Sequence, residues 1–227
     1  MYEKISANYG KIFKFNQAVV DFMDSYVSAN SNILDIGCGA GRYTDALVKL
    51  GHTAIGIDPD SESIERGKKL YPGTELLNSD LFGYETDRKF DLIFCIGNAI
   101  SHIPPQDIGP FIDRVYSLLE PGGVWIFHTI NWDFVLQQKE YDFQVLQADG
   151  TTFRRRYRNI TEEAVDFETS LTDEKGEEFK NMIKLFPLPD NKIKTIHNRF
   201  KFKSLFTDYK KTPFDGNDIS RVYVFSK

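Results

Sequence analysis

Two kinds of hydrophobic pattern alternate along the first 130 residues of the chain. Short apolar runs bounded by turn residues predict strands over 32–36, 53–57, 75–78, 90–96 and 124–130. Apolar residues at helical spacing predict helices over 17–26, 42–50, 61–70 and 108–119. The nearly continuous apolar texture of 90–96 is typical of a strand covered on both faces. This alternation of strands and helices predicts an α/β fold with a doubly wound, mostly parallel sheet.

The pattern changes after residue 131. Asp149-Gly150 is typical of a type I′ hairpin turn, and a second turn over 173–176 separates extended stretches near 164–171 and 178–186. Extended patterns at 200–209 and 221–226 then complete a seven-stranded sheet. We therefore expect a core formed by residues 1–130 plus 196–227, with an antiparallel β insert over 131–195 after the fifth strand.

Composition and charge narrow the class of protein. The 227 residues are 41% hydrophobic and 27% charged, which is enough apolar mass for one complete core. The sequence shows neither a membrane span nor a secretory signal, and its two cysteines cannot build a disulfide scaffold, so we expect a soluble cytoplasmic protein. Residues 1–130 carry 11 basic and 17 acidic side chains. This balance argues against nucleic acid as a partner.

A glycine-rich turn follows the first predicted strand. Glycine occupies every second position of Gly37-Cys38-Gly39-Ala40-Gly41, and Asp35 stands two residues before the first glycine. Such a turn can bring backbone N–H groups close to a ligand, which leaves NAD, FAD and S-adenosylmethionine as candidates. The dinucleotide fingerprint spaces its last two glycines three apart, and a pyrophosphate disfavours a nearby carboxylate. An amino-acid portion that carries an ammonium or sulfonium group fits Asp35 better.

Two further acids follow the next two strands. Asp58 ends the second strand, where it can accept hydrogen bonds from both hydroxyls of a ribose. Asp80 follows the third strand, where an adenine amino group can be read. Because the carboxyl ends of parallel strands meet at one edge of a sheet, we expect these acids and the glycine turn to line one crevice.

With these motifs the chain resembles the class I S-adenosylmethionine-dependent methyltransferases. The resemblance rests on Ile33–Gly41, Ile57-Asp58, Ser79-Asp80-Leu81 and Leu119–Gly123, and it covers about residues 1–130 plus the two final strands. It implies a Rossmann-like fold, S-adenosyl-L-methionine as cofactor and S-adenosyl-L-homocysteine as product. The cofactor-binding residues that it implies are Tyr9, Asp35, Gly37, Cys38, Gly39, Asp58, Asp80, Leu81, Ile96, Gly97 and His102.

A narrower resemblance to glycine N-methyltransferase-like enzymes lies in 94–103 and 129–134. It implies that Asn98 and His102 face the methionine portion of the cofactor and the acceptor, and that Tyr9 closes over the sulfonium. Phe134 stands where that family has tyrosine, and Ala99 stands where it commonly has serine. Both differences argue against glycine itself as the acceptor.

The candidate catalytic residues are His102, Asn98, Asn131, Tyr9 and Arg155. The histidine and the two asparagines either contact the acceptor or satisfy local backbone groups. Strand alternation places Arg155 on an apolar face with Phe153 and Tyr157, and the other arginines of 154–158 on the opposite face. An arginine on an apolar face needs a carboxylate, either Glu168 or one that belongs to a substrate.

The sequence therefore predicts a methyltransferase that acts on a small-molecule acceptor by in-line transfer, with nitrogen slightly favoured as the acceptor atom. In this interpretation the insert covers the acceptor pocket, no metal takes part, and the protein is a monomer or homodimer away from membranes. A protein or nucleic-acid acceptor, a non-catalytic cofactor-binding subunit, and a nicotinamide-dependent oxidoreductase are the alternatives.

Overall fold

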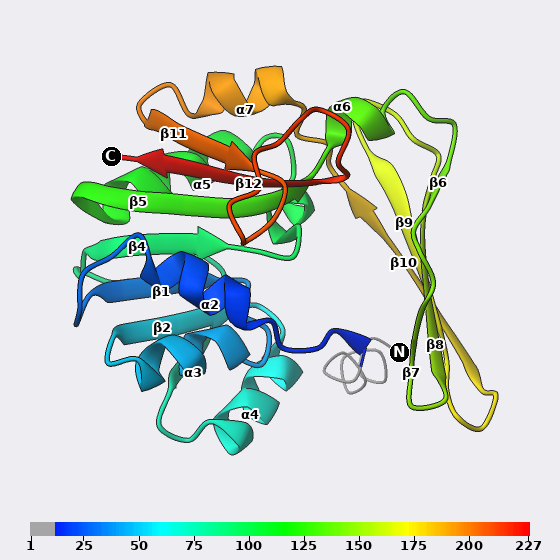
Figure 1. Cartoon of the computed structure of the whole chain (residues 1–227), viewed down its shortest axis with the longest axis horizontal. Coiled ribbons are helices and arrows are strands. Elements are labelled where there is room, and N and C mark those ends of the chain that lie inside the picture. The colour runs from blue at the N-terminus through cyan, green and yellow to red at the C-terminus, as the bar shows by residue number, and fades with distance from the viewer. Residues whose placement is uncertain (1–11) are drawn as a thin grey trace. The chain divides into compact units, whose positions relative to one another are not determined.

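The computed structural model describes residues 12–227 and divides them into two compact units (Figure 1). The core unit holds residues 16–131 and 190–227, and the insert unit holds residues 12–15 and 132–189. Residues 190–195, which were expected in the insert, belong to the core unit, whereas 12–15 group with the insert unit.

A seven-stranded sheet forms the centre of the core unit, with the order β11-β12-β5-β4-β1-β2-β3. β1 to β5 run parallel, β12 is antiparallel to β5, and β11 is antiparallel to β12. The strands are β1 (Asn32–Ile36), β2 (Thr53–Asp58), β3 (Glu75–Asn78), β4 (Phe90–Cys95), β5 (Leu119–Ile130), β11 (Lys201–Phe206) and β12 (Ser220–Ser226). The predicted doubly wound, mostly parallel sheet is confirmed.

The helices of the core unit begin and end close to their predicted bounds. They are α2 (Gln17–Asp24), α3 (Arg42–Lys49), α4 (Ser61–Leu70), the 3-10 helix η1 (Ala99–His102), α5 (Ile108–Leu118) and α7 (Asp190–Ile196). Asn16 caps α2 by accepting a hydrogen bond from Ala18 N–H, and Asp60 caps α4 by accepting one from Glu62 N–H. The hydrophobic pattern predicts neither η1 nor α7.

Apolar side chains of α2 and α3 cover one face of this sheet. Val20, Phe22 and Met23 of α2 are buried together with Leu47 of α3 and residues of β1, β4, β5 and β12. Strand register puts Asp35, Phe94, Ile126 and Val224 in one row across the sheet. Asp35 is therefore followed in this row by apolar residues of β4, β5 and β12.

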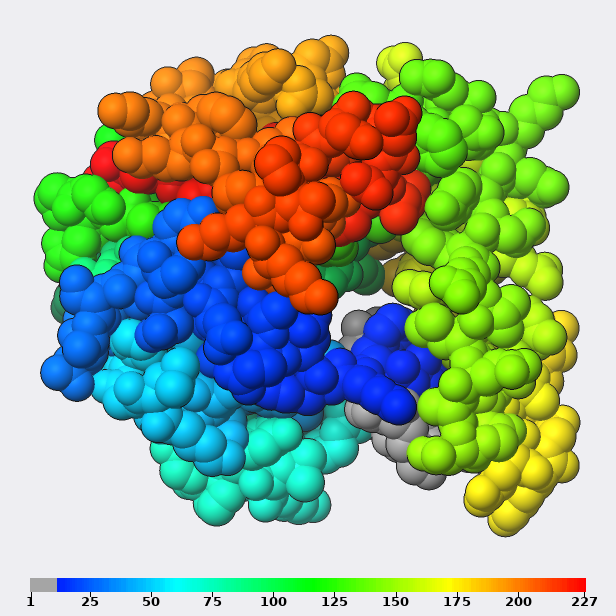
Figure 2. Space-filling model, in the orientation of Figure 1, coloured from blue at the N-terminus to red at the C-terminus, as the bar shows by residue number. Residues whose placement is uncertain are grey.

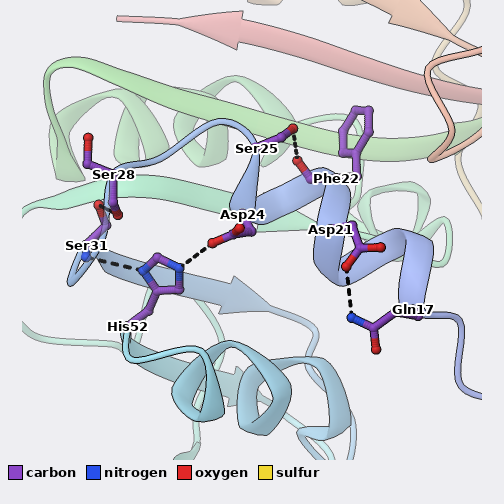
Figure 3. Close-up of polar contacts among 8 residues, drawn as sticks. All are labelled: Gln17, Asp21, Phe22, Asp24, Ser25, Ser28, Ser31 and His52. Atoms are coloured by element: carbon purple, nitrogen blue, oxygen red, sulfur yellow. Dashed lines mark hydrogen bonds and ion pairs between the residues drawn. The ribbon is translucent and has the colours of Figure 1, made fainter.

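A polar tie fastens α2 to the sheet at the amino ends of β1 and β2 (Figure 3). His52 Nδ1 accepts a hydrogen bond from Ser31 N–H at 3.3 Å, so the proton of a neutral ring lies on Nε2. Nε2 is 2.8 Å from Asp24 Oδ1 and donates to it. The tie joins the residues that precede β1 and β2 to the last residue of α2, and it lies at the opposite end of the strands from the glycine-rich turn.

The start of β5 differs from the prediction. The strand was predicted over 124–130, whereas β5 already pairs with β4 at Leu119. The pairing shifts register between Phe90 and Leu92, opposite this segment. Gly122 has φ of +82°, which glycine adopts without strain.

The insert unit is built on a separate antiparallel sheet. Its strand order is β10-β9-β8-β6, and β7 also pairs with β8. Its elements are α6 (Trp132–Val135), β6 (Tyr141–Asp142), β7 (Leu146–Ala148), β8 (Thr151–Arg158), β9 (Val165–Thr172) and β10 (Glu178–Leu185). Asp149 and Gly150 both have positive φ, as the predicted type I′ turn requires. The antiparallel insert after the fifth strand is confirmed.

One face of the insert sheet carries an apolar cluster. Phe153 and Leu171 are buried there against Ile12 and Phe13. Arg155, between Phe153 and Tyr157 on β8, places its guanidinium 4.8 Å from the ring centroid of Phe143 and 5.4 Å from that of Phe13. The alternation predicted for this strand is present, because Phe153 and Tyr157 are buried and Arg156 is exposed.

Candidate functional site

The glycine-rich turn lies at the carboxyl end of β1, where the chain order across the sheet reverses. β2 and β3 follow on one side of β1, and β4 and β5 on the other. Such a switch point is where open α/β sheets bind ligands. Gly37, Gly39 and Gly41 all have φ between +57° and +77°. A Cβ at Gly41 would lie 2.5 Å from Leu76 Cδ2, whereas one at Gly39 would meet nothing within 4 Å.

Hydrogen bonds pin this turn to the end of β2. Gly37 N–H and Cys38 N–H both donate to Ile57 O, and Gly39 N–H donates to Asp58 Oδ2 at 2.8 Å. The other carboxylate oxygen of Asp58 accepts from Asp60 N–H. We expected the turn's N–H groups to face a ligand, but these three bind β2 instead. The glycines are therefore needed for another reason. They let the backbone approach its neighbours closely and adopt positive φ angles.

Asp35 is a buried acid directly below this turn, with 2% of its surface exposed. Its Oδ2 accepts a hydrogen bond from Thr44 Oγ1 of α3 at 2.7 Å. Its Oδ1 is also buried and makes no hydrogen bond with any described residue. Burial raises the pKa of Asp35 to about 7, and the nearby charge of Asp58 adds to this. A cationic ligand group would supply the partner that Oδ1 lacks.

The acids at the ends of β2 and β3 have different surroundings. Burial raises the pKa of Asp58, which the two backbone N–H groups partly offset. Asp80 is exposed, and its Oδ1 accepts a hydrogen bond from Gly83 N–H, which closes a turn around buried Leu81. Asn78 Nδ2 donates to Asp58 O and Pro59 O, and so joins the end of β3 to the end of β2.

A polar network shapes the loop after β4. Asn98, at φ +64°, accepts three hydrogen bonds through Oδ1, from Ser101 Oγ, Thr129 Oγ1 and Ile130 N–H. Because a backbone N–H can only donate, this contact identifies the amide oxygen and leaves Nδ2 on the opposite side. Asn98 N–H donates to Nδ1 of His128 on β5 at 3.1 Å. The loop is thereby fixed to the carboxyl end of β5.

The neighbouring residues of this loop are more accessible. Ile96 is half-buried, and Gly97 is exposed with φ of +72°, where a Cβ would meet nothing within 4 Å. His102 ends η1 and is exposed, and partial desolvation of its ring lowers its pKa below the usual value. A neutral imidazole at neutral pH can accept a proton.

A family model described as a methyltransferase domain matches residues 33–123. A ubiquinone biosynthesis O-methyltransferase of Nitrobacter winogradskyi is 31% identical over 107 residues, which are 45% of this chain and 40% of that protein. One of Stutzerimonas stutzeri is 28% identical over 159 residues, which are 65% of this chain and 67% of that protein. The alignment thus spans less than half the length of the first relative.

Solved structures resemble the chain over nearly its full length. An S-adenosylmethionine-dependent methyltransferase from Clostridium acetobutylicum has a TM-score of 0.82 at 19% identity, and the match covers 99% of this chain and 98% of that one. An S-adenosylmethionine-bound amino pentose methyltransferase from Micromonospora echinaspora has a TM-score of 0.72 at 16% identity, with 99% and 95% covered. The core unit therefore contains a methyltransferase domain over residues 33–123, within a fold that it shares with S-adenosylmethionine-dependent methyltransferases. The narrower resemblance to glycine N-methyltransferase-like enzymes is not among these findings and stays a prediction.

The residues of the methyltransferase domain fit S-adenosylmethionine, its cofactor. The buried Asp35 Oδ1 without a hydrogen-bond partner suits the ammonium of the methionine portion, and open space at Gly39 admits a ligand close to the backbone. Asp58, at the end of the neighbouring strand, suits the ribose hydroxyls. Among the described residues, no group of three or more metal-ligating side chains comes together, and no helix is long and apolar enough to cross a membrane.

Asn131, at the same edge of the domain, uses its amide donors within the protein. Its Nδ2 donates to Gly216 O and Asp218 O, and its backbone N–H donates to Ile219 O. It therefore ties the loop between β11 and β12 to the end of β5. The geometry gives Asn131 a structural role in the methyltransferase domain.

The remaining candidates either fall outside the described residues of the core unit or carry thiols that are not reactive. Tyr9 lies outside the described residues. Arg155 belongs to the insert unit, where Glu168 is not its partner, because Glu168 pairs in register with Arg156 and so lies on the other face of the sheet. Burial beside acids raises the pKa of Cys38 and of Cys95 further above neutrality, so neither thiol is a ready nucleophile.

Three residues that shape the site of the methyltransferase domain were missed in the sequence. They are Thr44, which holds Asp35, Asn78, which holds the end of β2, and His128, which holds Asn98. Each acts through a contact with a residue of another element. No local motif marks such a contact, because it depends on how the elements pack in three dimensions.

Proposed function

We propose that this protein transfers a methyl group from S-adenosylmethionine to a small-molecule acceptor. The observation that carries the proposal is the set of acids at the switch point, with buried Asp35 below the glycine-rich turn and Asp58 on the adjacent strand. The family match over 33–123 covers both acids. When bound, the cofactor supplies an electrophilic methyl group on a sulfonium, whose leaving group is a neutral thioether.

In this proposal the protein's residues bind and align the reactants. Asp35 holds the ammonium, Asp58 accepts hydrogen bonds from the ribose, and Asp80 with Leu81 lines the adenine end. Asn98 presents Nδ2 as a fixed hydrogen-bond donor, because its Oδ1 is held by three donors. Alignment and exclusion of water can supply most of the acceleration of an in-line displacement. Ile96, Gly97 and Tyr9 complete the cofactor contacts that we infer.

We further infer that the acceptor atom is oxygen. The slight preference for nitrogen finds no support in the sequence relatives, which are named as O-methyltransferases. A hydroxyl acceptor must lose its proton, and His102 is the exposed group in the loop after β4 that can take it, since its lowered pKa keeps it neutral at pH 7. Selection of the acceptor is assigned to the insert unit, where Arg155 beside aromatic rings suits a planar or anionic group.

The test is to incubate the purified protein with methyl-labelled S-adenosylmethionine and a cell extract. Label in a low-molecular-mass product is the expected result, and mass spectrometry then separates an ether or ester from a methylated amine. Asp58→Ala serves as the matched variant, because the loss of ribose hydrogen bonds should weaken cofactor binding by about 1–3 kcal/mol. Label confined to protein or nucleic acid would overturn the proposed small-molecule acceptor, but the proposed methyl transfer would stand.

A further inference from the structure

The loop between β11 and β12 is built as a rigid element. Asp208 Oδ1 accepts hydrogen bonds from the N–H groups of Lys210 and Thr212, and Asp208 Oδ2 accepts one from Thr212 Oγ1. Thr207 N–H also donates to Thr212 O across the loop. Tyr209 lies inside this closed turn, so its backbone position is fixed.

The aromatic ring of Tyr209 packs between two elements of the core unit. Its centroid is 5.6 Å from that of Phe22 on α2, edge to face, and 6.3 Å from that of His128 on β5. Lys211 of the same loop lies over the ring of Tyr26, 4.9 Å from its centroid. Figure 2 shows the orange atoms of this part of the chain resting against the blue atoms of α2.

These contacts place Tyr209 at the carboxyl edge of the sheet, on the face covered by α2. His128 lies two residues past Ile126 on β5, on the same face of the strand, and Ile126 shares its row with Asp35. The phenol of Tyr209 is close enough to Tyr43, Cys95 and Asp35 for their charges to add to the effect of burial, and its pKa is raised.

The hydroxyl of Tyr209 makes no hydrogen bond with the described residues, although the side chain is mostly enclosed by protein. A phenol that stays protonated offers one O–H donor and an acceptor oxygen. Near Asp35, the ligand groups that match both properties are the carboxylate and the ammonium of an amino acid. A polar group that is held rigidly and left without a partner is arranged for a ligand at no further ordering cost.

We propose that Tyr209 is a cofactor-binding residue whose hydroxyl hydrogen-bonds the amino-acid portion of S-adenosylmethionine beside Asp35. The inference rests on the proposed function, because it needs this domain to bind that cofactor. It assigns the loop between β11 and β12 to the cofactor site. The sequence motifs of the site, which are the glycine-rich turn and the acids after β2 and β3, do not indicate that this loop takes part in cofactor binding.

Two ligands distinguish contacts with the amino-acid portion from contacts with the rest of the cofactor. S-adenosylhomocysteine carries it, whereas 5′-methylthioadenosine keeps only the adenosine and the thioether. Isothermal titration of the full chain with both ligands should show that Tyr209→Phe weakens S-adenosylhomocysteine binding about tenfold and leaves 5′-methylthioadenosine binding unchanged. Tyr26→Phe, which alters a hydroxyl of the same aromatic cluster, should change neither affinity.

The outcomes distinguish this inference from the proposed function. If Tyr209→Phe binds S-adenosylhomocysteine as well as the wild type does, or loses affinity for both ligands equally, the inference is overturned and the proposed function stands. If the wild-type protein binds neither ligand, the proposed function is overturned and the inference with it. The substitution removes only an oxygen atom, and an unchanged melting temperature of the free protein will show that the fold is kept.

Discussion

A single side chain, Asn98, joins structural and chemical roles in the loop after β4. Its oxygen satisfies three donors from β5 and η1, and its backbone takes a left-handed conformation that non-glycine residues rarely adopt. Strain of this kind persists only where surrounding contacts hold it. The remaining N–H donors of the amide are therefore presented in a fixed direction, which is the property that an acceptor-orienting group requires.

Two substitutions at this position separate those roles. Asn98→Ala leaves the buried Ile130 N–H without its acceptor, and we expect it to lower the free energy of unfolding by about 2–3 kcal/mol. Asn98→Asp keeps an oxygen for all three donors and removes the Nδ2 donor, so we expect a smaller loss of stability and a large loss of kcat. Urea unfolding and steady-state kinetics on both variants measure this. Equal kcat in Asn98→Asp and the wild type would exclude the amide from the reaction.

At the scale of elements, the local pattern was sufficient for most strands and helices of the core unit, although the start of β5 was not predicted. α4 covers the predicted 61–70, directly after its cap Asp60, and β3 covers the predicted 75–78. The short helices α6 and α7 have too few turns for a helical hydrophobic period to be recognised in the sequence. Their formation depends on tertiary contacts. In the site, Asp35 and Asp58 stand in a motif, whereas His128 and Tyr209 reach it only through pairing of β5 with β12 and β12 with β11.

One buried histidine fastens α7 to the sheet. His197 Nε2 accepts a hydrogen bond from Trp125 Nε1–H at 3.0 Å, Nδ1–H donates to Ile193 O, and the ring stacks on Phe225 with centroids 4.4 Å apart. His197→Leu leaves the buried Trp125 N–H without a partner. We expect it to lower the free energy of unfolding by about 2–4 kcal/mol.

The control for this prediction lies on α7, the helix that His197 directly follows. Lys194 bridges to Asp190 at 2.6 Å with most of its side chain in solvent, so Lys194→Ala should change stability by about 0.5 kcal/mol or less. Urea unfolding of both variants measures the contrast. Similar losses in the two would mean that His197 does not hold α7 in place.

At the scale of the whole molecule, three buried groups with large pKa shifts contribute to the response of stability to acid, and they do not act in the same direction. Burial lowers the pKa of His128 and His197 to about 4, below the ordinary value of 6.5. Between these values the unfolded chain binds two protons that the folded protein does not, so these histidines make stability fall as pH falls. Asp35, with its pKa raised to about 7, binds a proton in the folded state over the same range and offsets one of the two.

Removing Asp35 should therefore make the protein more sensitive to acid and more stable in alkali. With one net proton taken up on unfolding, these three groups cost the wild type about 3 kcal/mol between pH 6.5 and pH 4; in Asp35→Asn the cost rises to about 7 kcal/mol. At pH 8 the ionised Asp35 is a burden on the free protein, so Asp35→Asn should be the more stable of the two there. Urea unfolding of both proteins without cofactor at several pH values from 4.5 to 8 measures the two curves. Since all other titrating groups are shared, parallel curves would show that Asp35 does not carry the raised pKa on which its role at the ammonium depends.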